Sequence, residues 1–306
     1  MPIQVDVHQH VWTQPLVEAL ASRRSLPFIA RTDGLTLLHC AGERPYVIDI
    51  AAEAPVRRAQ LLATDRLDRA IVAVSSPIGI EGLDRESADL LIDAHLEGVA
   101  ALGERFAAWG PLALQESSPD DVDELLDRGC VGISMPAAAL AGIDALEAVA
   151  PVLQRIAVRG VPLFVHPGPA AGNDLWEASL TEPLWWPALT DYMAQMQAAW
   201  LAVATLGRKE HPDLVVLFAM LAGVAPLLAE RLATRGGPPV DLRDPWVFYD
   251  TSSYGAGAIE TMARLVGADQ LVYGSDRPVI EPIPTDRDTA LRVNAGRFLA
   301  PARSAA

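Results

Sequence analysis

Lysine and cysteine are scarce in this chain. Of its 24 basic residues only Lys209 is a lysine, and 39 acidic residues bring the net charge to −15. This charge argues against a nucleic-acid or anionic-membrane partner, because both need clustered positive side chains. Cys40 and Cys130 lie far apart and form no CxxC pair, which argues against a disulfide framework and a zinc ribbon. We expect two reduced thiols in a cytoplasmic protein.

The sequence also lacks an apolar run long enough to span a membrane. The best candidate, "LVVLFAMLAGVAPLLA" at residues 214–229, is shorter than the ~20 residues that a span needs, and it contains Gly223 and Pro226. We interpret it as a buried strand, a turn and the start of a helix. The N-terminus lacks the charged-then-apolar pattern of a secretory signal, which agrees with a cytoplasmic location.

Short apolar runs alternate with longer helical patterns along most of the chain. The candidate strands are residues 3–9, 70–75, 106–112, 130–135, 162–166, 214–219, 246–250 and 270–275. Helical patterns between them include residues 85–105, 118–129, 143–160 and 256–267. This alternation is typical of parallel βαβ units. Eight such units predict a single α/β domain over residues 1–306, folded as a (β/α)8 TIM barrel.

Two connections are longer than a barrel needs. Residues 12–50 contain the alternating segments "GLTLLHC" and "RPYVIDI", which predict a small β-hairpin inserted after the first strand as a lid. Residues 167–182 form a long loop after the fifth strand. Both connections begin at strand C-termini, where barrel enzymes build their active sites. We therefore expect both to border the site.

Four residues could hold a metal ion. In "DVHQHVW", His8 and His10 point to the same side of a strand, so their imidazoles could share an ion, although two ordinary strand-end histidines are an equal alternative. His166 ends the fifth strand and Asp276 follows the last strand, which places both at the same rim. Three imidazoles and one carboxylate suit Zn²⁺ or a related divalent ion. A water in the remaining position would become nucleophilic near neutral pH.

These motifs resemble those of the amidohydrolase superfamily, in particular the amidohydrolase-related branch that includes aminocarboxymuconate-semialdehyde decarboxylase. The resemblance covers the first-strand HxH, "HPG", "GSDRP", "HPDLVVL", "YDTSS" and "NAGRFL", and so nearly the whole chain. It implies a distorted (β/α)8 barrel with His8, His10, His166 and Asp276 as metal ligands. Asp276 would also take the proton from the metal-activated water. Zn²⁺ is the expected ion and Mn²⁺ the alternative, because an N₃O site accepts both.

The sequence departs from the family pattern at two points. Binuclear members of the superfamily bridge two metals through a carboxylated lysine on the fourth strand, but "CVGISM" has none, so we expect one metal. In this branch a histidine in a motif similar to "AHLGG" ends the sixth strand and handles protons. Here "AMLAG" places Met220 there, and a thioether cannot transfer protons. His211 lies before that strand, and His39 in the hairpin is expected to be structural.

Several side chains near the predicted rim are candidate substrate contacts. Arg277 could pair with a substrate carboxylate, with a structural ion pair as the alternative. Aromatic residues after the first and fifth strands could form an apolar pocket wall. With residues of the hairpin and the sixth strand, the full set is Arg277, Trp12, Trp176, Trp186, Arg44 and Met220. Asp250 in "YDTSS" is expected either to support a ligand from behind or to cap its strand.

The residues leave three functional hypotheses open. The leading one is an enzyme, a metal-dependent hydrolase whose activated water attacks an amide, lactone or related bond of a small polar molecule. The alternative is a non-oxidative decarboxylase of an aromatic or unsaturated carboxylic acid, which the resemblance favours and Met220 counts against. The third is a barrel that has lost catalysis and binds a ligand. The apolar segment at residues 183–200, "PLWWPALTDYMAQMQAAW", could also form a homodimer interface.

Overall fold

All eight predicted strands are present in the structure, which is a computed structural model that describes residues 2–170 and 181–299. The strands are β1 (Val5–Gln9), β5 (Arg69–Val72), β6 (Phe106–Ala108), β7 (Gly110–Pro111), β8 (Ile133–Pro136), β9 (Leu163–His166), β10 (Val216–Phe218), β11 (Val247–Asp250) and β12 (Leu271–Val272). β6 and β7 flank Trp109 in one continuous run, so they occupy one strand position.

The strands pair in parallel and in chain order. β1, β5 and β6 form one sheet, and β7 to β12 form another in which each strand pairs with the next. The two sheets are joined through the β6–β7 run, because the Trp109 N–H donates to Val72 O (2.9 Å) and the Gly110 N–H donates to Gly132 O (2.9 Å). One strand position thus belongs to both sheets.

Backbone hydrogen bonds also bring the last strand against the first. The Val7 N–H donates to Tyr273 O (3.0 Å), and the Asp276 N–H donates to His8 O (2.8 Å). A parallel bridge between Gln9 and Arg277 continues this pairing. The eight strand positions therefore close into a ring, which confirms the predicted barrel fold.

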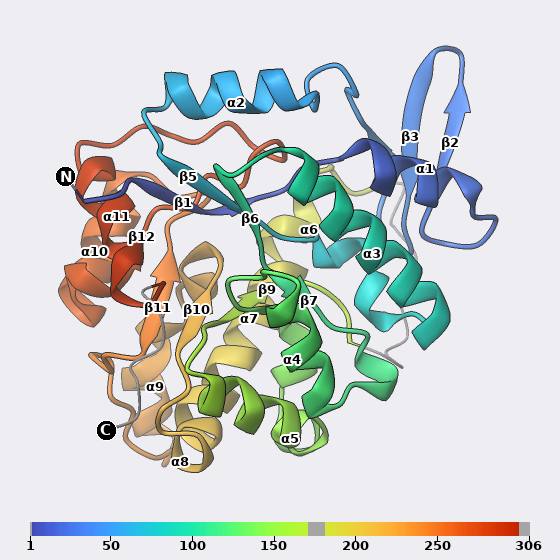
Figure 1. Cartoon of the computed structure of the whole chain (residues 1–306). Helices are drawn as coiled ribbons and strands as arrows, with labels where there is room; N and C mark the ends of the chain where they lie inside the picture. The colour runs from blue at the N-terminus through green and yellow to red at the C-terminus, as the bar shows by residue number, and fades with distance from the viewer. Residues whose placement is uncertain (1, 171–180, 300–306) are drawn as a thin grey trace.

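Helices surround the strands (Figure 1). They are α1 (Gln14–Ser22), α2 (Pro55–Thr64), α3 (Arg85–Ala101), α4 (Pro119–Asp127), α5 (Ile143–Arg159), α6 (Trp186–Leu189), α7 (Asp191–Ala202), α8 (Arg208–Glu210), α9 (Ala229–Thr234), α10 (Ala256–Val266) and α11 (Asp288–Asn294). Every residue of β8, β9, β10 and β11 is buried, as parallel strands covered on both faces require.

The helix ends follow the signals in the sequence. Ser118 and Asp121 form a capping box at the start of α4. Gly129 follows α4 with φ 90°, and Gly160 ends α5 with φ 63°. Both glycines have the left-handed conformation that commonly ends a helix.

The segment inserted after β1 has more structure than the predicted hairpin. β3 (Leu35–His39) and β4 (Tyr46–Val47) pair antiparallel, as "GLTLLHC" and "RPYVIDI" predicted. The longer pairing, however, joins β3 to β2 (Phe28–Thr32), which the sequence pattern did not single out. In Figure 1 the β2–β3 hairpin projects from the edge of the barrel, beyond α1.

The apolar run at residues 214–229 is confirmed as a strand, a turn and the start of a helix, namely β10, a left-handed turn and α9. In the turn, Met220 to Val224 have φ angles between 51° and 59°. Four of these five residues are not glycine, and the left-handed helical conformation costs each of them about 1–2 kcal/mol. Surrounding contacts must therefore hold the turn. No helix in residues 2–170 and 181–299 is long and apolar enough to cross a membrane.

A tight helix crossing lies next to β1. A Cβ added to Gly98 of α3 would lie 1.9 Å from Thr13 Oγ1, at the start of α1. We expect Gly98→Ala to lower the free energy of unfolding by about 1–3 kcal/mol, because neither backbone has room to move apart freely. Chemical denaturation measures this change.

Gly257→Ala is the matched control, because Gly257 is an exposed residue of α10 and a Cβ there meets nothing within 4 Å. We expect the control to be neutral or stabilising, since alanine has the higher helix propensity. Equal stabilities of the two variants would show that the crossing tolerates a methyl group.

Candidate metal centre

Three histidines and one aspartate meet at the C-terminal ends of the barrel strands. His8 and His10 lie at the end of β1, His166 ends β9, and Asp276 follows β12. Each offers one ligand atom, these four atoms lie within 4.8 Å of one another, and all four residues are buried. The structure thus brings together the four residues that the sequence placed at one rim.

The spacing of the donor atoms suits a metal ion. His8 Nε2 lies 3.2 Å from His10 Nε2, and Asp276 Oδ1 lies 3.5 Å and 3.2 Å from these two nitrogens. Ligands bound about 2.1 Å from one ion are about 3.0–3.5 Å apart. The three imidazole rings are nearly perpendicular to one another, with centroids 5.0 Å apart in each pair. The four residues therefore fit a single divalent ion.

Each histidine has a hydrogen-bond acceptor at its other ring nitrogen. The acceptors for Nδ1 are Asp250 Oδ2 for His8 (2.8 Å), Ala73 O for His10 (2.9 Å) and Pro167 O for His166 (2.9 Å). An acceptor at Nδ1 favours the neutral tautomer in which Nε2 carries a lone pair. The cluster can therefore offer three nitrogen lone pairs and one carboxylate.

The local charges favour a cation. Burial lowers the pKa of His8, but the charges of Asp250 and Asp276 outweigh burial and raise it to about 9. Burial, with His8 and His10 as neighbours, lowers the pKa of His166 well below its ordinary value. The carboxylates thus stabilise positive charge in a place where the imidazoles cannot all be protonated. A bound cation satisfies both conditions.

Asp250 links the cluster to the left-handed turn after β10. Its Oδ2 accepts from His8, while its Oδ1 accepts from the Met220 N–H (3.0 Å) and from Ser252 through N–H (2.9 Å) and O–H (2.6 Å). Burial raises the pKa of Asp250, but the charge of His8 and these hydrogen bonds lower it further, so the net shift is downward. Asp250 thus contacts a candidate ligand and also caps its own strand.

Gly274 makes the approach of Asp250 to His8 possible. A Cβ at this position would lie 2.9 Å from Asp250 Cγ and 2.9 Å from His8 Cβ. Real Cβ atoms do not come so close to other carbon atoms, so any larger residue would push the carboxylate and the imidazole apart.

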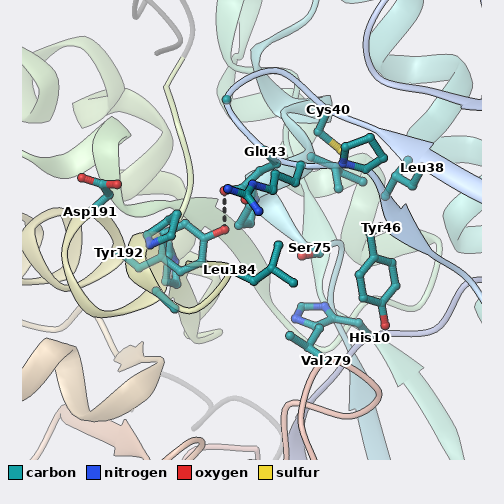
Figure 2. Close-up of a pocket in the computed structure, with 18 of the residues that line it drawn as sticks. His10, Leu38, Cys40, Glu43, Tyr46, Ser75, Leu184, Asp191, Tyr192 and Val279 are labelled. Carbon is teal, nitrogen blue, oxygen red and sulfur yellow. Dashed lines mark hydrogen bonds between the residues drawn. The ribbon is translucent and has the colours of Figure 1, made fainter. Parts of the chain in front are cut away.

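A cavity of about 630 Å³ opens above the cluster, with His10, His166 and Asp276 among its lining residues (Figure 2). Apolar side chains from the β3–β4 segment, from the segment after β5 and from the segment before α6 form much of its wall. They include Leu38, Val47, Ile78 and Leu184. An apolar cavity with a few polar groups is the usual form of a small-molecule site.

Some of the candidate substrate contacts line the cavity and others do not. Trp12, Arg44 and Met220 line the cavity. Trp186 does not line the described cavity, because the first turn of α6 presents Pro187 and Ala188 to it and leaves Trp186 41% exposed. Trp176 lies outside the described residues. The exposure of Trp186 and its neighbours Leu184, Trp185 and Leu189 fits the homodimer hypothesis, which stays a prediction.

Arg277 is paired within the protein. Its guanidinium contacts Glu281 Oε2 (2.6 Å) and Asp65 Oδ2 (3.3 Å), and Arg277 is not among the residues that line the described cavity. This arrangement favours the structural ion pair over a contact with a substrate carboxylate.

Sequence reasoning missed several polar residues that line the cavity, among them Glu43, Tyr46 and Tyr192. Glu43 and Tyr46 lie at the β3–β4 connection, and Tyr192 lies in α7. Glu43 and Tyr46 belong to the insertion after β1, and the sequence pattern of that insertion does not indicate how it lies over the barrel. Tyr192 has the sequence pattern of an ordinary packing residue in an apolar helix. His39, in contrast, stacks on Phe28 with ring centroids 4.7 Å apart, which agrees with its expected structural role.

Comparisons with known proteins agree with the fold. A sequence-family model described as "Amidohydrolase" matches residues 5–302. The solved structure of Metarhizium anisopliae IDCase in apo form is similar with a TM-score of 0.75 and 18% identity, covering 97% of this chain and 90% of that chain. The 5-carboxyvanillate decarboxylase LigW from Sphingomonas paucimobilis has a TM-score of 0.70 and 18% identity, covering 98% and 99%.

A third similar structure contains a metal. It is the 5-carboxyvanillate decarboxylase LigW2 from Novosphingobium aromaticivorans, with bound manganese and 3-methoxy-4-hydroxy-5-nitrobenzoic acid. Its TM-score is 0.71 at 15% identity, covering 97% of each chain. A search of curated protein sequences finds no match.

The hydrogen bond from His8 to Asp250 can be tested through metal affinity. We expect Asp250→Asn to weaken the binding of Zn²⁺ or Mn²⁺ by about 10–100-fold, because the amide no longer fixes the His8 tautomer through a charged acceptor. Titration of the metal-free protein in a metal buffer gives the affinity.

Asp244→Asn is the matched control. Asp244 lies before the N-terminal end of β11, away from Asp250, and pairs with Arg208 (2.7 Å). The loss of this ion pair should affect stability but not metal affinity. Equal metal affinities in the wild type and Asp250→Asn would count against Asp250 as a support of the metal site.

Proposed function

The chain belongs to the amidohydrolase family, and from that membership we propose that it is a metal-dependent non-oxidative decarboxylase of a small aromatic or unsaturated carboxylic acid. The observation that carries the proposal is the cluster of His8, His10, His166 and Asp276 at a largely apolar cavity. The cavity is large enough for a substituted aromatic ring, and its apolar wall suits one.

Three considerations place decarboxylation before hydrolysis. Two of the similar structures are named as 5-carboxyvanillate decarboxylases. The apolar wall favours a reaction that converts a localised carboxylate charge into neutral CO2, because such an environment stabilises a localised charge less than water does. The cluster also offers a place to hold a carboxylate against a cation. Hydrolysis, which the sequence placed first, becomes the second candidate.

The proposed cofactor is one divalent ion, either Zn²⁺ or Mn²⁺. The three nitrogens and one oxygen accept both ions, and manganese is the ion named in the similar LigW2 structure. β8 contains no lysine that could bridge a second metal, and Lys209 lies in α8, before β10. When bound, the ion would act as a Lewis acid toward a carboxylate or carbonyl oxygen of the substrate.

The protein residues would orient the substrate and exclude water. His10 and His166 reach the cavity with their Nδ1 atoms hydrogen-bonded to backbone oxygens, so their rings are fixed. The Asp276 N–H donates to His8 O, which holds this carboxylate beside the imidazoles. Leu38 and Ile78 cover the cavity wall and limit the access of water to the reacting carbon.

Hydrolysis of an amide, lactone or related bond remains a candidate because of two residues. Met220 lines the cavity at the end of β10 and carries no proton that could be passed to a carbanion. Asp276 lines the same cavity and can accept a proton from an attacking water.

A panel assay tests the proposed function. We expect the wild type, loaded with Mn²⁺ or Zn²⁺, to release CO2 from one or more acids in a panel of hydroxybenzoic and unsaturated carboxylic acids. His166→Ala should reduce the rate by at least ~100-fold, because it removes a ligand and hence the electrophile. CO2 release and metal content are measured on the same samples.

His39→Ala is the control, because His39 lies in the hairpin and is stacked on Phe28. We expect it to keep its metal and its activity. Turnover of amides or lactones without CO2 release would support the hydrolase instead. A metal content below ~0.2 ions per chain after loading would contradict both the metal-dependent decarboxylase and the metal-dependent hydrolase, and would favour a barrel that has lost catalysis.

A further inference from the structure

Both candidate reactions need a proton that Met220 cannot supply. When a carboxylate leaves as CO2, its bonding electron pair stays on carbon, which then takes up a proton. When an amide or ester bond is hydrolysed, the leaving nitrogen or oxygen takes up the proton instead. Met220 lies in the cavity and its thioether has no exchangeable proton. Another residue of the cavity must hold one.

A carboxyl group and a tyrosine lie together in the wall of the same cavity. The Tyr192 O–H donates to Glu43 Oε1 at 2.6 Å. Tyr192 belongs to α7, whereas Glu43 lies in the connection between β3 and β4. In Figure 2 the two residues lie on one side of the cavity and Tyr46 lies on the other. Next to the pair, Arg44 donates to the backbone oxygen of Glu182, so a second bond ties this connection to the segment before α6.

The surroundings of the pair shift the pKa values of Glu43 and Tyr192, and these shifts suit the two residues to different roles. Burial raises the pKa of Glu43, the hydrogen bond from Tyr192 lowers it and the charge of Asp191 raises it, with a net upward shift. Burial also raises the pKa of Tyr192 far above its ordinary value, and the charges of Glu43, Cys40 and Asp276 add to this effect. Tyr192 therefore keeps its proton as a donor, while Glu43 can gain and lose one nearer to neutral pH.

Three other ionisable residues of the cavity wall, namely Arg44, Cys40 and Tyr46, are less suitable. A guanidinium such as that of Arg44 does not deprotonate in proteins. Burial, with Glu43 as a neighbour, raises the pKa of Cys40 to about 12. Tyr46 is 39% exposed, and burial raises its pKa above an already high ordinary value. The charged or ionisable groups around the pair are Cys40, Arg44, Glu182, Asp191 and Asp276.

We propose that Glu43 is the proton source of the active site and that it acts through the hydroxyl group of Tyr192, in the place of the histidine that Met220 replaces. The inference rests on the proposed function, and it holds for either reaction. The pair joins the insertion after β1 to α7, the helix that lies between β9 and β10 in the sequence.

The proton transfer balances with solvent water as the final source of the proton. With Glu43 protonated, the hydrogen bond of the pair reverses, so that Glu43 donates to the Tyr192 oxygen and the Tyr192 hydrogen faces the substrate. As the C–C bond breaks and CO2 leaves, the electron pair on carbon takes the Tyr192 proton. The Glu43 proton passes to the Tyr192 oxygen, and water returns a proton to the Glu43 carboxylate. In hydrolysis the leaving atom, in place of the carbon, takes the Tyr192 proton, and Asp276 releases to the solvent the proton that it takes from the attacking water.

Variants of the pair test this assignment. On the best acid of the panel, with metal loaded, we expect Glu43→Gln and Tyr192→Phe to lower kcat by about 100-fold or more while metal content and KM stay close to those of the wild type. Glu43→Asp should recover part of the loss, because it keeps a carboxyl group. Glu97→Gln is the control, since it removes an exposed carboxylate of α3 that does not line the cavity and should leave kcat unchanged.

The pH profile separates proton donation from a structural role. The donor must be protonated, so the wild-type rate should fall as pH rises through the pKa of Glu43. Asp191→Asn removes a like charge that raises this pKa, so the fall should move to lower pH with the maximal rate retained. An unmoved profile in Asp191→Asn, or a kcat of Glu43→Gln within about threefold of the wild type, would overturn the proposal.

The pair can be judged even if the proposed function fails. If the metal-loaded wild type turns over no acid, amide or lactone, the proposed function is wrong, and the state of Glu43 is read directly from the 13C-labelled carboxyl group by NMR. Glu43→Gln assigns the signal. A Glu43 pKa above 4.5, the ordinary value, supports the proposal, whereas a value at or below 4.5 overturns it.

Discussion

The hydrogen bond between His8 Nδ1 and Asp250 Oδ2, 2.8 Å long and fully buried, is the interaction on which the site depends. It joins the first strand position to the seventh, with only the eighth strand position between them. It fixes the His8 imidazole so that Nε2 faces the other donors, and the same carboxylate holds the Met220 N–H at the start of the left-handed turn. Gly274 leaves the space that this contact needs. One carboxylate therefore sets both the geometry of a candidate ligand and the path of the chain beside it.

The barrel supplies a rigid floor, and two long connections supply the walls. The four donors stand at strand ends whose positions are fixed by backbone hydrogen bonds around the ring. The insertion after β1 and the chain after β9 meet above that floor through the Tyr192–Glu43 hydrogen bond. In this fold the catalytic residues usually lie at the strand ends, and the loops above them vary.

The arrangement of the cavity accommodates an apolar residue, Met220, at the end of the sixth strand position. In the branch that the sequence resembles, the end of the sixth strand carries the group that handles protons, whereas here that position is apolar and belongs to the cavity wall. Removing a polar group from the floor makes the surroundings of the substrate drier, and a half-buried carboxyl group in the cover can take over proton transfer because burial keeps it protonated to higher pH. Met220 and Glu43 line the same cavity.

The sequence by itself determined the eight strand positions and the meeting of His8, His10, His166 and Asp276. It could do so because parallel strands are buried apolar runs with fixed direction, so residues at their C-terminal ends must share one rim. Only the tertiary structure decided that Arg277 turns to Asp65 and Glu281, that Trp186 faces away from the cavity, and that Glu43 meets Tyr192. These side chains lie outside the barrel strands, and their positions depend on contacts between residues far apart in the sequence, 149 positions for Glu43 and Tyr192, rather than on any local period.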